Sequence, residues 1–113
     1  MLSAENRLKN HRDIDRVFRR GRYFASEDIS CKLLSSRRPV SRAVVVVSKK
    51  ISKKATVRNK IRRKVSAALK EQWETVLPGY DIVITVRKDL AETPSPEIGH
   101  QLQKVLRSAV KPS

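Results

Sequence analysis

The densest group of chemically active side chains is the basic run KKISKKATVRNKIRRK, residues 49–64, which contains no acidic residue. Arginine offers forked donors that suit phosphate oxygens, and lysine offers a point charge. An asparagine amide can donate to and accept from a sugar or a base edge. The run therefore predicts contact with the backbone of a nucleic acid. The candidate RNA-binding residues are Lys49, Lys50, Lys53, Lys54, Arg58, Asn59, Lys60, Arg62, Arg63 and Lys64.

The second half of this run opens the strongest predicted helix, at about residues 55–75. On a helical projection, every solvent-facing direction of its first turns is cationic. An ordinary solvated face usually mixes both signs, because like charges four residues apart are destabilising, so we favour RNA contact. Backbone N–H groups and lysines in the preceding loop, residues 48–54, also suit phosphates. The apolar stripe that should pack on a sheet consists of Val57, Ile61, Val65, Ala68, Leu69 and Gln72.

The elements around this helix follow from caps, turns and hydrophobic periodicity. A first helix is expected to start at Asn10 and to stop at Gly21. Strands are predicted at residues 29–34, 43–47 and 80–87. A last helix is predicted from the helical spacing of Ile98, Leu102, Val105 and Leu106.

Four consecutive valines, residues 44–47, leave their strand without a polar face, so this strand should be central in the sheet. The predicted order is helix, strand, strand, strand or extended edge, helix, strand, helix. Residues 1–113 then form one domain, an α/β (α+β) two-layer sandwich of about four strands and three helices.

The composition points to a polyanionic partner. Lysine and arginine number 26 against 11 acidic residues, which gives a net charge of +15. That charge suits a nucleic acid or an anionic membrane surface. No stretch reaches the ~20 apolar residues of a membrane span, and the N-terminus lacks the apolar core of a secretory signal. We expect a cytoplasmic protein without a membrane partner, in which the single cysteine, Cys31, is a buried thiol.

No constellation of residues suggests that the chain is a nuclease by itself. His11 and His100 have no spacing that pairs them, and Asp13 and Asp15 would project about 200° apart on a helix. We therefore expect no catalytic residue, no metal site and no bound cofactor. The motifs of an ATPase, a zinc ribbon and a serine hydrolase do not occur.

The segment SKKISKKATVRNKIRRKVSAAL resembles the signature of the bacterial ribonuclease P protein family, in which an RNR-type block opens a long helix. NRLKNHRDIDRVFRRGRYF is similar to the N-terminal helix of that family with its closing glycine, and GYDIVITVRK to its last strand. The likeness covers nearly the whole chain. The block reads Arg58, Asn59, Lys60 here, so it keeps the charge of a strict RNR but has an ammonium in place of one forked guanidinium.

The resemblance implies a protein subunit that binds one large catalytic RNA and assists removal of the 5′ leader from precursor tRNA. The RNA would perform the chemistry, with magnesium, and the protein would join it as a monomer in a 1:1 complex. It also implies an unusual left-handed crossover around the basic helix.

In the family, a groove between the N-terminal helix and the sheet takes the single-stranded leader, and aromatic residues there stack on bases. Phe18 matches one groove aromatic, whereas Ile14 and Lys32 stand at the other two aromatic positions. Leader contact is therefore expected to depend more on charge, through Lys32 and the helix arginines Arg12 and Arg16. Phe18 is equally compatible with a place in the core.

Two alternatives share the basic charge. A structural RNA-binding protein of the ribosomal kind would need no enzyme partner. A DNA-binding protein is less favoured, because the basic helix shows no partner in a helix-turn-helix arrangement.

Overall fold

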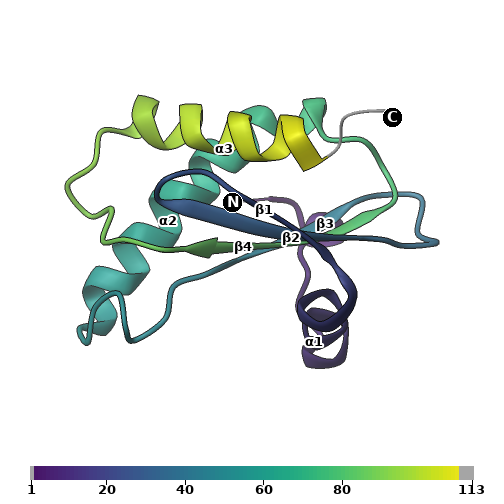
Figure 1. Cartoon of the computed structure of the whole chain (residues 1–113), viewed down its shortest axis with the longest axis horizontal. Coiled ribbons are helices and arrows are strands. Elements are labelled where there is room, and N and C mark those ends of the chain that lie inside the picture. The colour runs from purple at the N-terminus through teal and green to yellow at the C-terminus, as the bar shows by residue number, and fades with distance from the viewer. Residues whose placement is uncertain (1, 110–113) are drawn as a thin grey trace.

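The structure, a computed structural model, describes residues 2–109, which form a four-stranded sheet with helices on both faces (Figure 1). The predicted α+β class with four strands and three α-helices is confirmed. Met1 and residues 110–113, which the one-domain prediction includes, lie outside the described residues. The elements in chain order are η1 (Ala4–Asn6), α1 (His11–Arg20), β1 (Arg22–Ala25), β2 (Ile29–Ser35), β3 (Arg42–Val46), α2 (Ala55–Gln72), η2 (Trp73–Thr75), β4 (Tyr80–Val86) and α3 (Ser95–Ala109).

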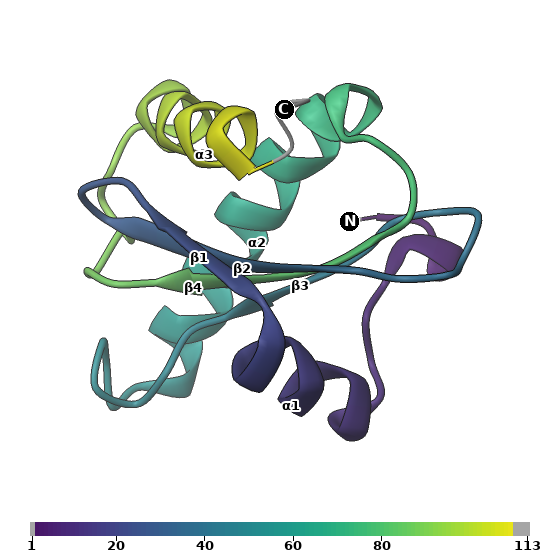
Figure 2. The same cartoon turned by 45° about the vertical axis from the view of Figure 1, so that its right-hand side comes forward.

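The sheet has the strand order β1-β2-β4-β3. Strands β1 and β2, and likewise β2 and β4, pair antiparallel, whereas β3 and β4 pair parallel. Helix α2 connects the two parallel strands. Followed through Figures 1 and 2, the path from β3 over α2 to β4 is left-handed, as the family resemblance implies.

Two apolar clusters hold helices on the two faces of the sheet. Alternate strand residues such as Cys31, Val45 and Ile84 face α2 and α3 and belong to the larger cluster. The opposite face carries a smaller cluster, in which Val17 of α1 packs with Val83 of β4. Figure 2 shows α1 packed on that face, while α3 and most of α2 lie on the other. The sheet therefore leaves part of its α1 face uncovered by helices.

The boundaries of α1 follow from the two residues that flank it, Asn10 and Gly21. The Asn10 side chain accepts a hydrogen bond from the Arg12 N–H at 2.8 Å, which caps the helix as predicted. At the other end, a Cβ on Gly21 would lie 2.5 Å from the Val17 carbonyl oxygen. Only glycine fits there, and it lets β1 begin directly after the helix.

The valine-rich strand β3 is an edge strand, so the prediction of a central position is wrong. Its valines are buried by the helices on the two faces of the sheet and not by strands on both edges. Val45 packs against the α2 side of the core and Val44 against the α1 side, which explains the absence of a polar face. The outer edge is partly protected because the Leu8 N–H donates to the Ala43 carbonyl at 3.0 Å. Strand β4 takes the central position.

The buried-thiol prediction for Cys31 is confirmed, since this side chain is only 1% exposed. Burial raises the pKa of the Cys31 thiol to about 12. The thiol therefore behaves as a small apolar group of the core.

Candidate nucleic-acid interface

The basic loop and the first turns of α2 extend past the sheet onto the side that carries α1 (Figures 1 and 2). The loop is held by its own backbone, because the Ile51 N–H donates to the Ser48 carbonyl at 3.1 Å. Arg58 fixes it further, since its guanidinium donates to the carbonyls of Ser52 and Lys53 at 2.9 and 3.0 Å. One arginine of the predicted RNA-binding block thus shapes the loop that should cradle phosphates.

Most of the remaining predicted RNA-binding side chains are exposed. The Arg62 guanidinium donates to the Asn59 Oδ1 at 2.6 Å, and the Lys60 ammonium lies 3.5 Å from the Glu92 carboxylate. These contacts are at the surface and leave further donors for a phosphate. The exposed members of the set are Lys49, Lys50, Lys53, Lys54, Asn59, Lys60 and Arg63.

Lys64 differs from its neighbours in this set. Its ammonium donates to the carbonyls of Leu90, Ala91 and Thr93 at 3.3, 3.1 and 2.5 Å. An ammonium has three N–H donors, so these contacts use its full capacity. Lys64 therefore anchors the loop between β4 and α3, and its predicted RNA contact is not tested by this geometry.

A second candidate surface lies where α1 meets β2. Phe18 is 38% exposed, whereas its neighbour Val17 is fully buried, so Phe18 stands at the edge of the helix and not in the core. The Lys32 ammonium lies 5.9 Å from the centre of the Phe18 ring and donates to the Phe18 carbonyl. The aromatic ring and the lysine of the expected leader groove are thus adjacent. Ile14 is half-buried and packs on the smaller cluster beneath them.

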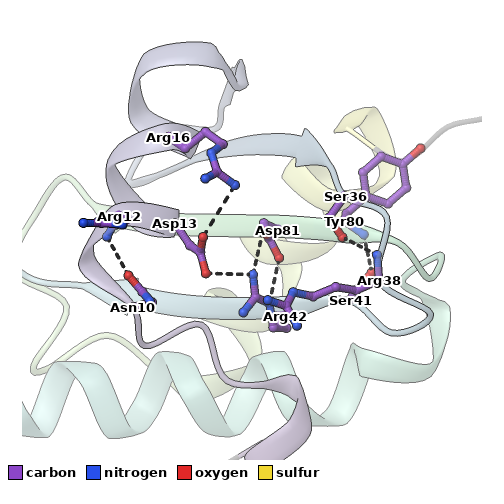
Figure 3. Close-up of polar contacts among 10 residues, drawn as sticks. All are labelled: Asn10, Arg12, Asp13, Arg16, Ser36, Arg38, Ser41, Arg42, Tyr80 and Asp81. Atoms are coloured by element: carbon purple, nitrogen blue, oxygen red, sulfur yellow. Dashed lines mark hydrogen bonds and ion pairs between the residues drawn. The ribbon is translucent and has the colours of Figure 1, made fainter.

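Arg12 and Arg16 are placed differently from Phe18. Arg16 lies two residues before Phe18, so the two side chains project about 200° apart on α1. The Arg16 guanidinium lies 3.5 Å from the Asp13 carboxylate and lines a separate polar hollow with Arg38 (Figure 3). The Arg12 side chain is exposed. A leader that contacts Phe18 would have to pass over α1 to reach Arg16.

A nearly buried charge network fastens α1 to the sheet (Figure 3). The Arg42 guanidinium donates to both carboxylate oxygens of Asp81 at 2.9 and 2.8 Å, and to Asp13 at 3.3 Å. The hydrogen bonds that Arg42 donates to Asp81, and then the one it donates to Asp13, raise the pKa of its guanidinium. Because Asp13 belongs to α1 and Arg42 and Asp81 to β3 and β4, the network sets where the helix crosses the strands.

The family model for ribonuclease P matches residues 2–110 of this chain. The chain belongs to the ribonuclease P protein family. The Ribonuclease P protein component of Picosynechococcus sp. is 33% identical over 110 residues, which are 97% of this chain and 92% of that protein. That of Geobacillus thermodenitrificans is 38% identical over 109 residues, 96% of this chain and 89% of that protein.

Solved ribonuclease P proteins have the same fold. The Thermotoga maritima protein superimposes with a TM-score of 0.81 at 27% identity, covering 90% of this chain and 96% of that one. The Staphylococcus aureus protein gives a TM-score of 0.80 at 25% identity, with 92% and 94% covered. The chain is therefore a protein subunit of the ribonucleoprotein endoribonuclease, and the ribosomal and DNA-binding alternatives receive no support.

The two histidines lie apart, and two of the carboxylates are bound to one arginine. Over residues 2–109, no three His, Cys, Asp or Glu side chains group as a metal site would require. His11 belongs to α1 and His100 to α3, which lie on opposite faces of the sheet. Asp13 and Asp81 both bind Arg42.

Among the described helices, none is both long enough and apolar enough to cross a membrane.

One exposed aromatic residue beside Lys32 was not found by sequence reasoning. Tyr23 belongs to β1, and it lies directly opposite Lys32 in the register of the hairpin. The sequence prediction allowed an extended edge strand but did not locate it. The signal was available in the alternation of RYFA, in which Phe24 faces the core and Tyr23 the other side.

Proposed function

We propose that this protein binds the catalytic RNA of ribonuclease P and the 5′ leader of precursor tRNA, and thereby assists removal of the leader. The single observation that supports this most is that the two candidate surfaces share one side of the sheet. The basic loop with the start of α2, and the strip of Phe18 and Lys32, both lie on the side that carries α1. A single RNA assembly can therefore contact both.

The basic surface suits the folded catalytic RNA. Its cations are concentrated within residues 49–64, without an acidic residue in the run. Phosphate contacts of this kind give strong but largely sequence-independent binding, which is what a positioning subunit requires. The RNA performs the cleavage, and magnesium belongs to the RNA. The protein acts as a monomer in a 1:1 complex in the cytoplasm.

The strip of Phe18 and Lys32 suits a single-stranded leader. A base can stack on the Phe18 ring, and the Lys32 ammonium beside it can meet the adjoining phosphate. Neither contact selects a particular base, which fits an enzyme that processes many precursors. The polypeptide supplies binding and orientation of the leader, and the RNA supplies the reaction.

Replacing Lys32 tests this assignment. Lys32→Ala should weaken binding of precursor tRNA by the assembled enzyme several-fold, more at low salt, because an exposed charge pair is worth under ~1 kcal/mol and is screened. Binding of mature tRNA should stay unchanged, because it has no leader. The measurement is the dissociation constant for both tRNAs at two salt concentrations.

Lys70→Ala is the matched control, since Lys70 is an exposed lysine of α2 beyond the basic run. It should leave both affinities near those of the parent. Equal losses for precursor and mature tRNA with Lys32→Ala would show that Lys32 lies outside the leader path.

A further inference from the structure

Tyr23 is the most exposed large apolar side chain that the structure describes, with 56% of its surface accessible. An exposed tyrosine on an edge strand can simply reflect the preference of aromatic residues for strands. Strand β1 contributes to the core through Phe24, the residue next to Tyr23, which packs against the larger cluster. Tyr23 therefore contributes little to that core, and its surroundings must decide its role.

The register of the hairpin places Tyr23 on the face of the sheet that carries α1. Its Cα is paired with that of Lys32, and residues directly opposite each other in an antiparallel pair project to the same side, with Cβ atoms ~5 Å apart. Lys32 in turn lies 5.9 Å from the Phe18 ring. The three side chains thus form a continuous strip of aromatic ring, ammonium and aromatic ring across β1, β2 and α1.

We propose that Tyr23 is a second base-stacking residue for the precursor leader. The inference rests on the proposed function of the Phe18 and Lys32 strip, and it adds the residue that takes over stacking on the strand side. The aromatic ring missing at Lys32 is supplied one strand further out, by a side chain in register with it. Two neighbouring bases stack on Tyr23 and Phe18, and the phosphate between them meets the Lys32 ammonium.

The experiment measures binding of precursor and mature tRNA to the enzyme assembled with Tyr23→Ala or Tyr23→Phe. Tyr23→Ala should weaken precursor binding about fivefold, the lower end of what a stacked base contributes, and leave mature tRNA binding unchanged. Tyr23→Phe keeps the ring and should bind like the parent. Because the tyrosine is uncharged, Tyr23→Ala should not alter the salt dependence, unlike Lys32→Ala.

A scan of the leader locates the stacked base. Precursors with a single abasic nucleotide at each leader position should reveal one position where the penalty seen with the parent disappears in Tyr23→Ala. Leu77→Ala is the control, because Leu77 is an exposed apolar residue, 43% accessible, in the turn before β4. It should behave like the parent throughout.

Phe18→Ala and Lys32→Ala, measured in the same series, separate failure of this inference from failure of the proposed function. If Phe18→Ala and Lys32→Ala weaken binding of precursor tRNA but not of mature tRNA, while Tyr23→Ala binds both like the parent, then the proposed leader site is supported and Tyr23 is not part of it. If the abasic penalties persist at every position in Tyr23→Ala, the stacking role is also wrong. If none of the three variants discriminates, the leader groove itself is refuted.

Discussion

Individual cations of this protein divide into those that bind its own backbone and those that remain for RNA. Arg58 and Lys64 donate to main-chain carbonyls of neighbouring loops. Lys49, Lys50 and Arg63 are exposed. Residues of the first kind shape the surface, and we expect residues of the second kind to contact phosphate, although both look alike in the sequence.

Along α1, too, the sequence does not show which residues of similar type share a surface. The likeness to the family placed Phe18 and Lys32 in one groove, and the structure brings them together. The helix arginine Arg16 was grouped with them by its charge, but it lies on the other flank of α1 beside Asp13. The carbonyl partners of Lys64 are distant along the chain, so no local pattern could have indicated them.

Arg42 offers a test of what positions α1. Arg42→Ala should lower the free energy of unfolding by about 3 kcal/mol, because it leaves the nearly buried Asp81 and Asp13 carboxylates without their partner. Asp13→Asn keeps the bidentate pair between Arg42 and Asp81 and should cost about 1 kcal/mol. Urea unfolding of both variants measures the difference. Equal stability of Arg42→Ala and the parent would show that the network does not hold the helix.

At the scale of elements, local patterns predicted most of the sheet and helices but not the arrangement of the edges. The long helix, the cap at Asn10 and strands β2 and β4 lie where the sequence places them. The valines of β3 correctly indicated a buried strand, but the predicted central position was wrong. At this edge of the sheet, α1 and the segment around Leu8 cover the strand where a neighbouring strand would otherwise do so. The short strand β1 was missed because the alternation that indicates it extends over only four residues.

The basic start of α2 should dominate binding of the catalytic RNA. Replacing Lys60, Arg62 and Arg63 together by alanine should lower affinity and flatten its salt dependence, by roughly 0.7 to 0.9 in log–log slope for each phosphate that is no longer neutralised. The domain should stay folded, because the buried stripe of α2 is made by other residues, among them Ile61 and Val65. Titrations over a range of salt, with circular dichroism, test both statements.

Lys70→Ala is again the control, and its slope should differ little from that of the parent. An unchanged slope in the triple variant would mean that this helix does not contact the RNA.

At the scale of the whole molecule, the chain carries a net charge of +15 and keeps its larger apolar core on the α2 and α3 side. The other side presents α1, the open part of the sheet and the basic loop. Such an excess of charge attracts RNA over long range. We propose that the basic loop and the start of α2 then bind the catalytic RNA, while the strip of Phe18 and Lys32 binds the leader. In this proposal the protein supplies binding and the RNA supplies the cleavage reaction.

Cleavage by a reconstituted enzyme tests that claim most directly. Precursor tRNA is incubated at low magnesium with the purified protein, with a ribonuclease P RNA, and with both, and the 5′ end of the product is mapped. We expect little cleavage by the RNA alone, none by the protein alone, and efficient removal of the leader at the mature 5′ end by the two together. Correct cleavage by RNA-free protein, or no stimulation of the RNA by the protein, would contradict the claim.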